Sequence, residues 1–237
     1  MLGRLEEAFT SQRRFLDDTS HELRTPLTVI RGQVELLELD ETPEERAETT
    51  RLVLDELDRL SRMVDDLFLL ARAEHPDFLR PDRVKVATFL VDLHRRLSTL
   101  TPLALVADVP DGLVITADPH RLAQAVTQLV ANAVKHAGAD PRVELGARVD
   151  DGELVVWVAD DGPGVPVDEA PRVFDRSHRG VAADRGGAGL GLAIVRAIAE
   201  AHAGSARLAP TAQGARFELR LPLTATSSQV APHVSTA

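Results

Sequence analysis

The stretch Ser20-His21-Glu22-Leu23-Arg24-Thr25-Pro26 lies within a helical pattern that organises the first third of the chain. Apolar residues recur every seven positions, and a companion row follows three or four positions later, as in the seam of a coiled helical bundle. The two rows are Leu2, Phe9, Leu16, Leu23, Ile30 and Leu37, and Ser20, Leu27 and Val34. His21 is one position off this seam, so we expect it on the flank of the bundle. Pro26 lacks an N–H and crowds the preceding turn, which predicts a kink close to His21.

Two side chains near His21 could support chemistry at its ring. A carboxylate such as Glu22 that reaches one ring nitrogen would fix the tautomer and leave the other nitrogen as a nucleophile. Thr25 lies one helical turn after His21 and shares its face. A lone histidine on a helix is more often a solvated residue, and Thr25 could simply cap the backbone that Pro26 loosens.

The wider segment carries a more specific signal. Residues 15–27, which read Phe-Leu-Asp-Asp-Thr-Ser-His-Glu-Leu-Arg-Thr-Pro-Leu, resemble the phosphoacceptor box of sensor histidine kinases. The resemblance implies that His21 accepts a phosphoryl group. It also implies that Thr25 aligns the water that removes phosphate from the partner protein in bifunctional members of the family.

Composition restricts the class of protein. The 237 residues are 44% hydrophobic and 27% charged, which suits one large or two modest globular domains. The net charge of −10 argues against nucleic acid as a partner, because binding to its phosphates needs a basic face. The absence of cysteine suits a reducing compartment, and no apolar run reaches the roughly 20 residues that span a bilayer. We therefore expect a cytoplasmic chain without membrane contact of its own.

The first domain is expected to be a helical hairpin. The heptad pattern is already in phase at Leu2, which would fit the output part of a membrane-bound sensor. Thr42 is typical of an N-cap, and Pro43 would occupy the first position of a second helix. The seam of that helix is Val53, Leu57, Leu60, Val64, Leu67 and Ala71. Because each hairpin has only one apolar stripe per helix, we predict a homodimeric four-helix bundle in residues 1–77.

The rest of the chain has mixed periodicity. Residues 75–82 contain two prolines and predict a linker with a hinge. The pattern then predicts strands near 84–86, 104–109, 113–116, 142–149, 153–159 and 215–221, and helices near 88–100, 118–136 and 190–202. These elements predict an α+β chain whose second domain, residues 78–224, is an α/β sandwich with helices on one face of its sheet. The small, polar residues 225–237 predict a disordered tail.

Three clusters in this second domain suit a polyphosphate ligand. Asn132, Lys135 and His136 lie on one helix and offer an amide oxygen for Mg²⁺, an ammonium and an imidazole. Asp160-Asp161-Gly162-Pro163-Gly164 directly follows a strand, and residues 186–192 form a glycine-rich start to a helix, where anions are favoured. A dinucleotide-binding fold is disfavoured, because the glycines come late and no acidic residue follows a preceding buried parallel strand.

Together these clusters resemble the N, G1, F and G2 boxes of the histidine-kinase catalytic domain. The boxes are residues 128–136, 160–164, 173–176 and 187–192, and with the phosphoacceptor box the resemblance covers residues 5 to 222. It implies that Asp160 accepts a hydrogen bond from the adenine amino group of ATP, that Asn132 ligates Mg²⁺ and that Lys135 meets phosphate oxygens. It also places at the nucleotide His136, Gly162, Gly164, Arg176, Gly187, Gly189, Leu190 and Gly191, under a mobile lid at residues 177–185. Where many relatives have an aromatic pair after Phe-x-Arg, this chain has Ser177-His178.

The resemblance implies an ATP- and Mg²⁺-dependent homodimeric kinase that phosphorylates itself on His21 and passes the group to an aspartate of a response regulator. A nucleotide-operated ATPase of the gyrase or heat-shock chaperone kind would have a similar nucleotide domain. Those ATPases have a glutamate one turn before the metal-binding asparagine, where this chain has Gln128, and an amide cannot act as a base. A third alternative is an inactive dimeric scaffold, although every box residue that it would need to lack is present.

Overall fold

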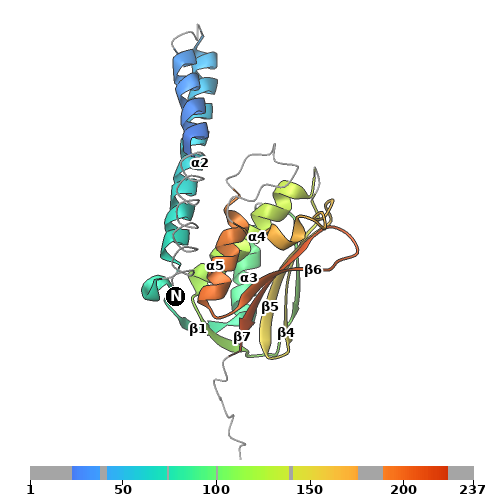
Figure 1. Ribbon diagram of the computed structural model, residues 1–237. Coiled ribbons are helices and arrows are strands. Elements are labelled where there is room, and N and C mark those ends of the chain that lie inside the picture. The colour runs from blue at the N-terminus through green and yellow to red at the C-terminus, as the bar shows by residue number, and fades with distance from the viewer. Residues whose placement is uncertain are drawn as a thin grey trace, which may run out of the picture. The chain divides into compact units, whose positions relative to one another are not determined.

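The computed structural model describes residues 23–37, 42–73, 75–99, 101–138, 141–175 and 189–223 (Figure 1). The expectations for His21, Glu22, Arg176 and Gly187, for the lid at 177–185 and for the tail at 225–237 lie outside these ranges. The described residues form two compact units: those up to His75 with Val167–Ile194, and Pro76–Pro166 with those from Val195 onward. The domain limits expected from the sequence, residues 1–77 and 78–224, remain predictions.

The first unit contains a helical hairpin. Residues 23–37 are helical, and α2 covers Pro43–Arg72. Thr42 caps α2 as expected: its hydroxyl accepts the N–H of Glu45 at 3.2 Å, and the Glu45 carboxylate accepts the N–H of Thr42 at 3.0 Å. This reciprocal pair satisfies two donors at the start of the helix. Among the described helices, none is both long and apolar enough to cross a membrane.

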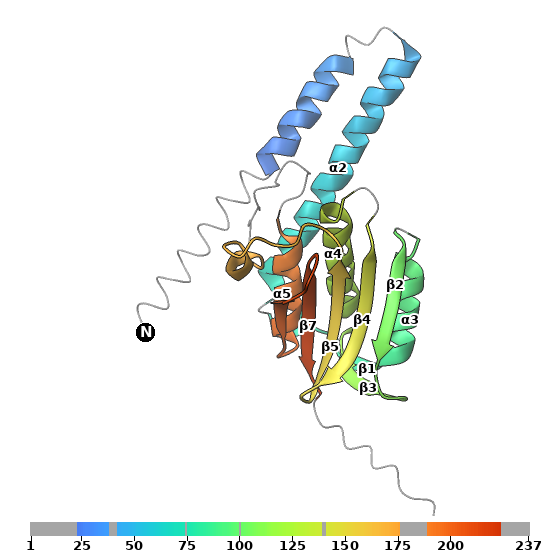
Figure 2. The same cartoon turned by 90° about the vertical axis from the view of Figure 1, so that its right-hand side faces the viewer.

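The second unit is built on a five-stranded sheet with helices on one face (Figures 1 and 2). The strand order is β2-β4-β5-β7-β6, in which β2 runs parallel to β4 and the other neighbours are antiparallel. The strands are β2 Leu103–Asp108, β4 Val143–Asp150, β5 Glu153–Asp160, β6 Ser205–Ala209 and β7 Arg216–Pro222, and the helices are α3 Val86–Leu97, α4 Pro119–His136 and α5 Gly191–Ala201. The expected α/β sandwich with one covered face is confirmed.

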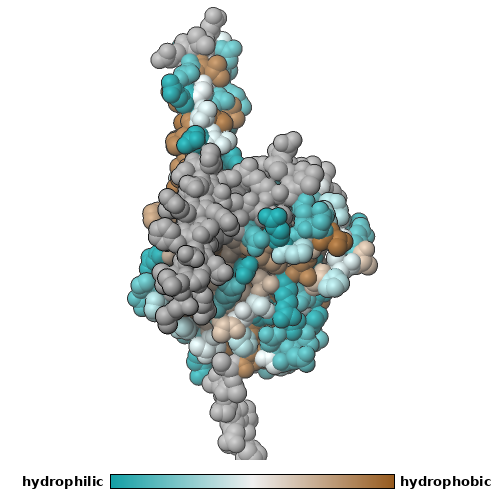
Figure 3. Space-filling view, viewed as in Figure 1, coloured by the Kyte–Doolittle hydropathy of each residue, from teal (hydrophilic) through white to brown (hydrophobic). Residues whose placement is uncertain are grey.

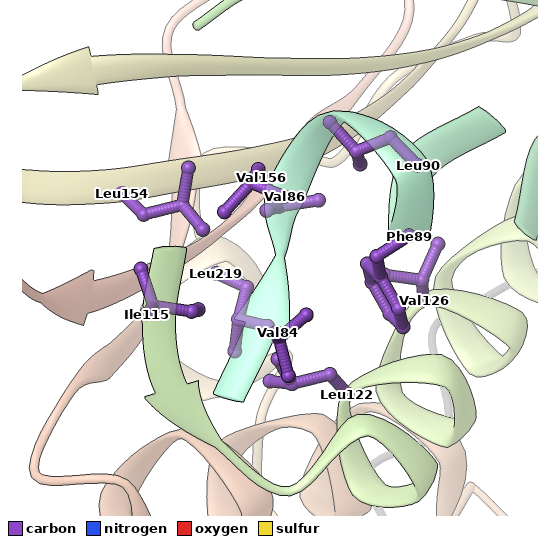
Figure 4. Close-up of a pocket in the computed structure, with 10 residues that line it drawn as sticks. All are labelled: Val84, Val86, Phe89, Leu90, Ile115, Leu122, Val126, Leu154, Val156 and Leu219. Carbon is purple, nitrogen blue, oxygen red and sulfur yellow. The ribbon is translucent and has the colours of Figure 1, made fainter. Parts of the chain in front are cut away.

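A small second sheet completes the core of this unit. It consists of two antiparallel strands, β1 Asp82–Lys85 and β3 Val114–Ala117. Figure 4 shows the apolar gap between this sheet, α3, α4 and the large sheet, which is lined by Val84, Val86, Phe89, Leu90, Ile115, Leu122, Val126, Leu154, Val156 and Leu219. Its volume of about 10 Å³ suffices for about one water molecule, so the gap is a packing feature and too small for a ligand.

On the face of the large sheet that points away from the helices, side chains of the strands themselves cover the sheet. Because side chains alternate along β5, Trp157 points away from the helices and lies over Gly146, where a Cβ atom would come within 2.0 Å of the indole ring. The indole N–H donates to Glu144 Oε1 at 2.9 Å, and the Arg216 guanidinium lies 4.1 Å from the ring centroid. These contacts bury Trp157 beside charged side chains on this face.

Two features of the sheet were not expected from the sequence. The edge strand β6 is absent from the predicted elements, because its run Ser-Ala-Arg-Leu-Ala contains no β-branched or aromatic residue. The parallel pairing of β2 with β4 joins residues such as Leu103 and Val143, which lie far apart in the chain. Neither feature leaves a local signal that periodicity could detect.

Candidate functional site

Asp118 fixes the start of α4, the helix that carries the first polar cluster. Its Oδ1 accepts the backbone N–H groups of His120 and Arg121 at 2.9 and 3.0 Å, and its Oδ2 accepts the N–H of Arg80 at 2.8 Å. Burial by itself would raise the pKa of Asp118, but these donors and the charge of Arg121 outweigh it and hold the pKa below its ordinary value. Asp118 is therefore charged at neutral pH and acts as a strong N-cap.

The far end of α4 presents Asn132, Lys135 and His136. The apolar face of the helix is buried through Leu122, Ala125, Val126, Leu129, Val130 and Ala133. Asn132 and Lys135 lie beside that face and are half-buried, while His136 is exposed. The amide oxygen of Asn132 is a hard donor, and Mg²⁺ usually binds through few protein groups together with water and phosphate oxygens. The residues present therefore fit an ion that a nucleotide brings with it.

Asp160 stands at the end of β5 and is only 8% exposed. Its Oδ1 accepts the backbone N–H of Gly162 at 3.0 Å and that of Ala215 at 3.2 Å. Burial raises the pKa of this carboxyl above its ordinary value, while the two N–H donors and the charge of His136 act in the opposite direction. The carboxylate is thus held in one orientation in a site shielded from water, which strengthens any hydrogen bond that it accepts from a ligand.

Three glycines bring three backbone segments together around Asp160. A Cβ atom on Gly162 would lie 2.8 Å from the Cα atom of Ala137, at the end of α4. Gly164 and Gly214 have φ angles of 77° and 69°, and a Cβ atom on Gly164 would lie 2.8 Å from the carbonyl oxygen of Gly214. The end of α4, the turn after β5 and the turn before β7 therefore meet at a backbone distance that only glycine permits.

The turn before β7 is a part of this site that the sequence did not predict. Ala215 donates to Asp160, and Gly214 packs against the Asp160 backbone, yet neither is among the predicted site residues. The only sequence signal is a glycine in the polar turn Thr211-Ala212-Gln213-Gly214, which is typical of many β-turns.

The last glycine cluster leads into α5. Gly189 has a φ of 65°, and Gly191 is the first residue of the helix. The carbonyl oxygen of Leu190 accepts the N–H of Ile194 at 2.9 Å, which is the first turn of helical bonding. A glycine-rich helix start of this kind favours an anion. These residues belong to the first compact unit, whereas Asn132, Lys135, His136 and Asp160, with Gly162 and Gly164, belong to the second.

Thr25 is the one predicted residue of the phosphoacceptor box that the structure describes. It lies in the helical residues 23–37 and is exposed, while Pro26 after it is buried. One turn later, the hydroxyl of Thr28 donates to the carbonyl oxygen of Arg24 at 2.9 Å. The exposed position of Thr25 leaves it accessible to a docking partner.

Two family models match the chain. Residues 11–76 match the His Kinase A (phospho-acceptor) domain, and residues 117–225 match the histidine kinase-, DNA gyrase B- and HSP90-like ATPase family. The probable sensor histidine kinase TcrY of Mycobacterium tuberculosis is 38% identical over 220 residues, which are 90% of this chain and 46% of the relative. The chain thus spans about half the length of the curated relatives that it matches.

Solved structures show the same architecture. The Acinetobacter baumannii histidine kinase AdeS has a TM-score of 0.68 at 21% identity, over 86% of this chain and 98% of the AdeS chain. Full-length ShkA in complex with AMPPNP has a TM-score of 0.63 at 32% identity, over 89% of this chain and 45% of ShkA. The chain belongs to the sensor histidine kinases of two-component systems, and it comprises a phosphoacceptor domain followed by an ATP-binding domain.

Proposed function

We propose that this chain is an ATP-dependent protein histidine kinase that phosphorylates itself on His21 and transfers the group to an aspartate of a response regulator. The observation that carries this proposal is the presence, in one chain, of a phosphoacceptor domain and an ATP-binding domain with a buried, oriented Asp160. ShkA, which is 32% identical to this chain, binds the ATP analogue AMPPNP. We place the chain in the cytoplasm, as an output part to which a membrane-bound sensor could be joined.

The nucleotide would be bound by the residues around Asp160 and at the end of α4. Asp160 accepts a hydrogen bond from the adenine amino group, and Gly162 and Gly164 shape the base pocket. Asn132 contributes an oxygen ligand to Mg²⁺, which would neutralise phosphate charge when bound. Lys135 contributes a positive charge to the phosphate oxygens. The remaining predicted contacts are those of His136, Arg176, Gly187, Gly189, Leu190 and Gly191.

Transfer to His21 needs a neutral, correctly oriented ring. A ring nitrogen of His21 attacks the γ-phosphorus, so that an N–P bond forms while the bond from phosphorus to the β–γ bridging oxygen breaks, and ADP leaves with that electron pair. Glu22 orients the ring and balances the charge that develops on it. The N–P bond then breaks as an aspartate oxygen of the regulator takes the phosphoryl group, which returns His21 to its starting state.

Simple ATP hydrolysis is disfavoured by the residue at Gln128. On α4 it lies one turn before Asn132 and is half-buried. Its amide group cannot remove a proton from water at neutral pH. Simple ATP hydrolysis also does not require a phosphoacceptor domain, which residues 11–76 match.

A homodimer is supported by the surface of the hairpin. Side chains on its predicted seam are exposed in the single chain, among them Leu27 at 55%, Val34 at 47% and Leu57 at 42%. Figure 3 shows apolar side chains at the surface of this hairpin. Burial of such a stripe against a second copy would remove it from water and build the four-helix core.

The proposal is tested with γ-phosphate-labelled ATP and Mg²⁺. Wild type should gain an acid-labile label that mass spectrometry locates on His21. His21→Gln should keep its affinity for ADP and gain no label, whereas Asn132→Ala should lose Mg²⁺-dependent nucleotide binding. His120→Gln is the matched control, because His120 is an exposed histidine on the first turn of α4. Acid-stable label, or label that survives His21→Gln, would reject the assignment.

A further inference from the structure

We propose that Gly214 and Ala215, in the turn between β6 and β7, determine the selectivity of the site for adenine over other purines. They would do so by holding the Asp160 carboxylate in the orientation that accepts the adenine amino group. The inference rests on the proposed function, which places adenine at Asp160, and it assigns a role to a turn outside the four predicted boxes.

The two carboxylate oxygens of Asp160 differ in the hydrogen bonds that they accept. Within the described residues, the two bonds recorded for this side chain, from Gly162 and Ala215, both end on Oδ1. A carboxylate has about four acceptor positions, so Oδ2 keeps its capacity for a ligand donor. The bond from Ala215 is buried, where a hydrogen bond is stronger and its loss is more costly. Ala215 and Gly162 together therefore hold Oδ1, which leaves Oδ2 available to the base.

Gly214 makes this arrangement possible by its close approach. A Cβ atom at Gly214 would lie 1.7 Å from the Asp160 carbonyl oxygen and 3.0 Å from the Asp161 Cα atom. The Asp160 N–H also donates to the Ala215 carbonyl oxygen at 2.9 Å, so the two residues are joined through both backbone and side chain. Any side chain at Gly214 must push the turn away from β5, and the N–H of Ala215 would move with it.

The expected consequence concerns the edge of the base that faces Asp160. Hypoxanthine has a carbonyl oxygen in place of the adenine amino group and a proton on N1, and its carbonyl oxygen would face the lone pairs of Oδ2. A site built around one donor rejects an analogue that lacks it. Wild type should therefore bind ADP at least about 10-fold more tightly than IDP. Once the buried bond from Ala215 is lost, only the part-buried bond from Gly162 orients the Asp160 carboxylate, and the ratio of the IDP to the ADP dissociation constant should fall towards one.

The experiment measures the dissociation constants of ADP and IDP by calorimetry on the full chain with Mg²⁺, for wild type, Gly214→Ala and Gly204→Ala. Gly204 is a matched control: a Cβ atom there would lie 2.0 Å from the Arg220 carbonyl oxygen, at the opposite end of the β6–β7 pair. Gly204→Ala should lower the melting temperature without changing the ADP-to-IDP ratio. Gly214→Ala should reduce the ratio mainly through loss of ADP affinity.

Asp160→Asn separates this inference from the proposed function. If that variant keeps the wild-type ratio, the assignment of adenine to Asp160 is itself wrong. The role of the turn is rejected if Asp160→Asn brings the ratio of the IDP to the ADP dissociation constant to one while Gly214→Ala keeps the wild-type ratio. An equal loss of affinity for ADP and IDP in Gly214→Ala keeps that ratio and therefore rejects it too. Should Gly214→Ala fail to fold, Ala215→Pro removes the same N–H donor, although its ring also restricts the backbone of Gly214, and a wild-type ratio of the two dissociation constants in that variant rejects the proposal equally.

Discussion

Asp66 is a carboxyl group that the fold places in an unfavourable setting on α2. Burial, followed by the negative charge of Asp65, raises its pKa from 3.8 to about 6, and the charge of Arg62 offsets this only in part. Above that pH the folded chain must carry a poorly solvated charge at this position. The residue therefore reduces stability at neutral pH.

Replacement of Asp66 should change how stability depends on pH. The folded protein binds the Asp66 proton more tightly than the unfolded chain, so its contribution to the free energy of unfolding falls as pH rises from 3.8 to about 6. Asp66→Asn should therefore stabilise the chain at pH 8, by about 2 kcal/mol, and have little effect near pH 4. Urea denaturation at both pH values measures this difference. Ser61→Asn, at an exposed position of the same helix without a titratable group, should show no such dependence.

Thr25 should act on the phosphorylated regulator and not on ATP. Thr25 is exposed and lies on the face that the sequence assigns to His21, so its hydroxyl can orient water at a docked phospho-aspartate. Thr25→Ala should leave the rate of autophosphorylation nearly intact while it slows dephosphorylation of the regulator by about 10-fold or more. Both rates and the melting temperature are measured on the same variant. A parallel loss of both rates with a lower melting temperature would instead show that Thr25 only supports the backbone beside Pro26.

At the scale of elements, the segment after the hairpin is bound to α4. The short 3₁₀ turn η1, Pro76–Phe78, places Phe78 in the core at 4% exposure, with the Arg121 guanidinium 4.4 Å from its ring centroid. Two residues later, the N–H of Arg80 donates to Asp118. The sequence predicted a hinge across residues 75–82, and of these residues those from Pro76 onward belong to the second unit, which includes Pro76–Pro166. The hinge itself stays a prediction.

Loss of Phe78 should weaken this attachment. Phe78→Ala removes a buried ring and the stacking of Arg121, so it should lower the free energy of unfolding of the second unit by about 3–4 kcal/mol. Denaturation followed by the fluorescence of Trp157 reports on that unit. Val91→Ala, at a position 53% exposed on α3, should cost no more than about 0.5 kcal/mol. Equal effects of the two substitutions would contradict a structural role for Phe78.

At the scale of the whole molecule, activity should depend on pairing of two hairpins. Leu60→Asp places a charge on the predicted seam, where burial against a second copy would leave it unpaired. The variant should sediment as a monomer or unfold, and its self-labelling should be lost. Ser61→Asp adds the same charge at the next, exposed position and should remain dimeric and active. A monomeric Leu60→Asp protein that labels itself at the wild-type rate would contradict the dimer.

The amino-acid sequence by itself determined the features whose signals are local. Thr42 caps a helix as predicted, and Asp118 caps α4 at the start of the predicted helix 118–136, because the hydrogen bonds of an N-cap close within three residues of the cap. The hairpin between β4 and β5 follows from alternating residues around Asp150-Asp151-Gly152, and Asp160 follows directly on the predicted strand. The glycine and asparagine boxes are equally local, since each lies on one turn or one helix face.

Only the tertiary structure decided which segments meet around these local features. Ala215 donates to Asp160 across 55 positions of sequence, and the Trp157 ring lies on Gly146 because of the register between β4 and β5. The pairing of β2 with β4 and the position of β6 at the edge of the sheet also depend on contacts between distant parts of the sequence. Such contacts depend on strand order and register, which the packing of the whole core selects, and no short stretch of residues contains that information.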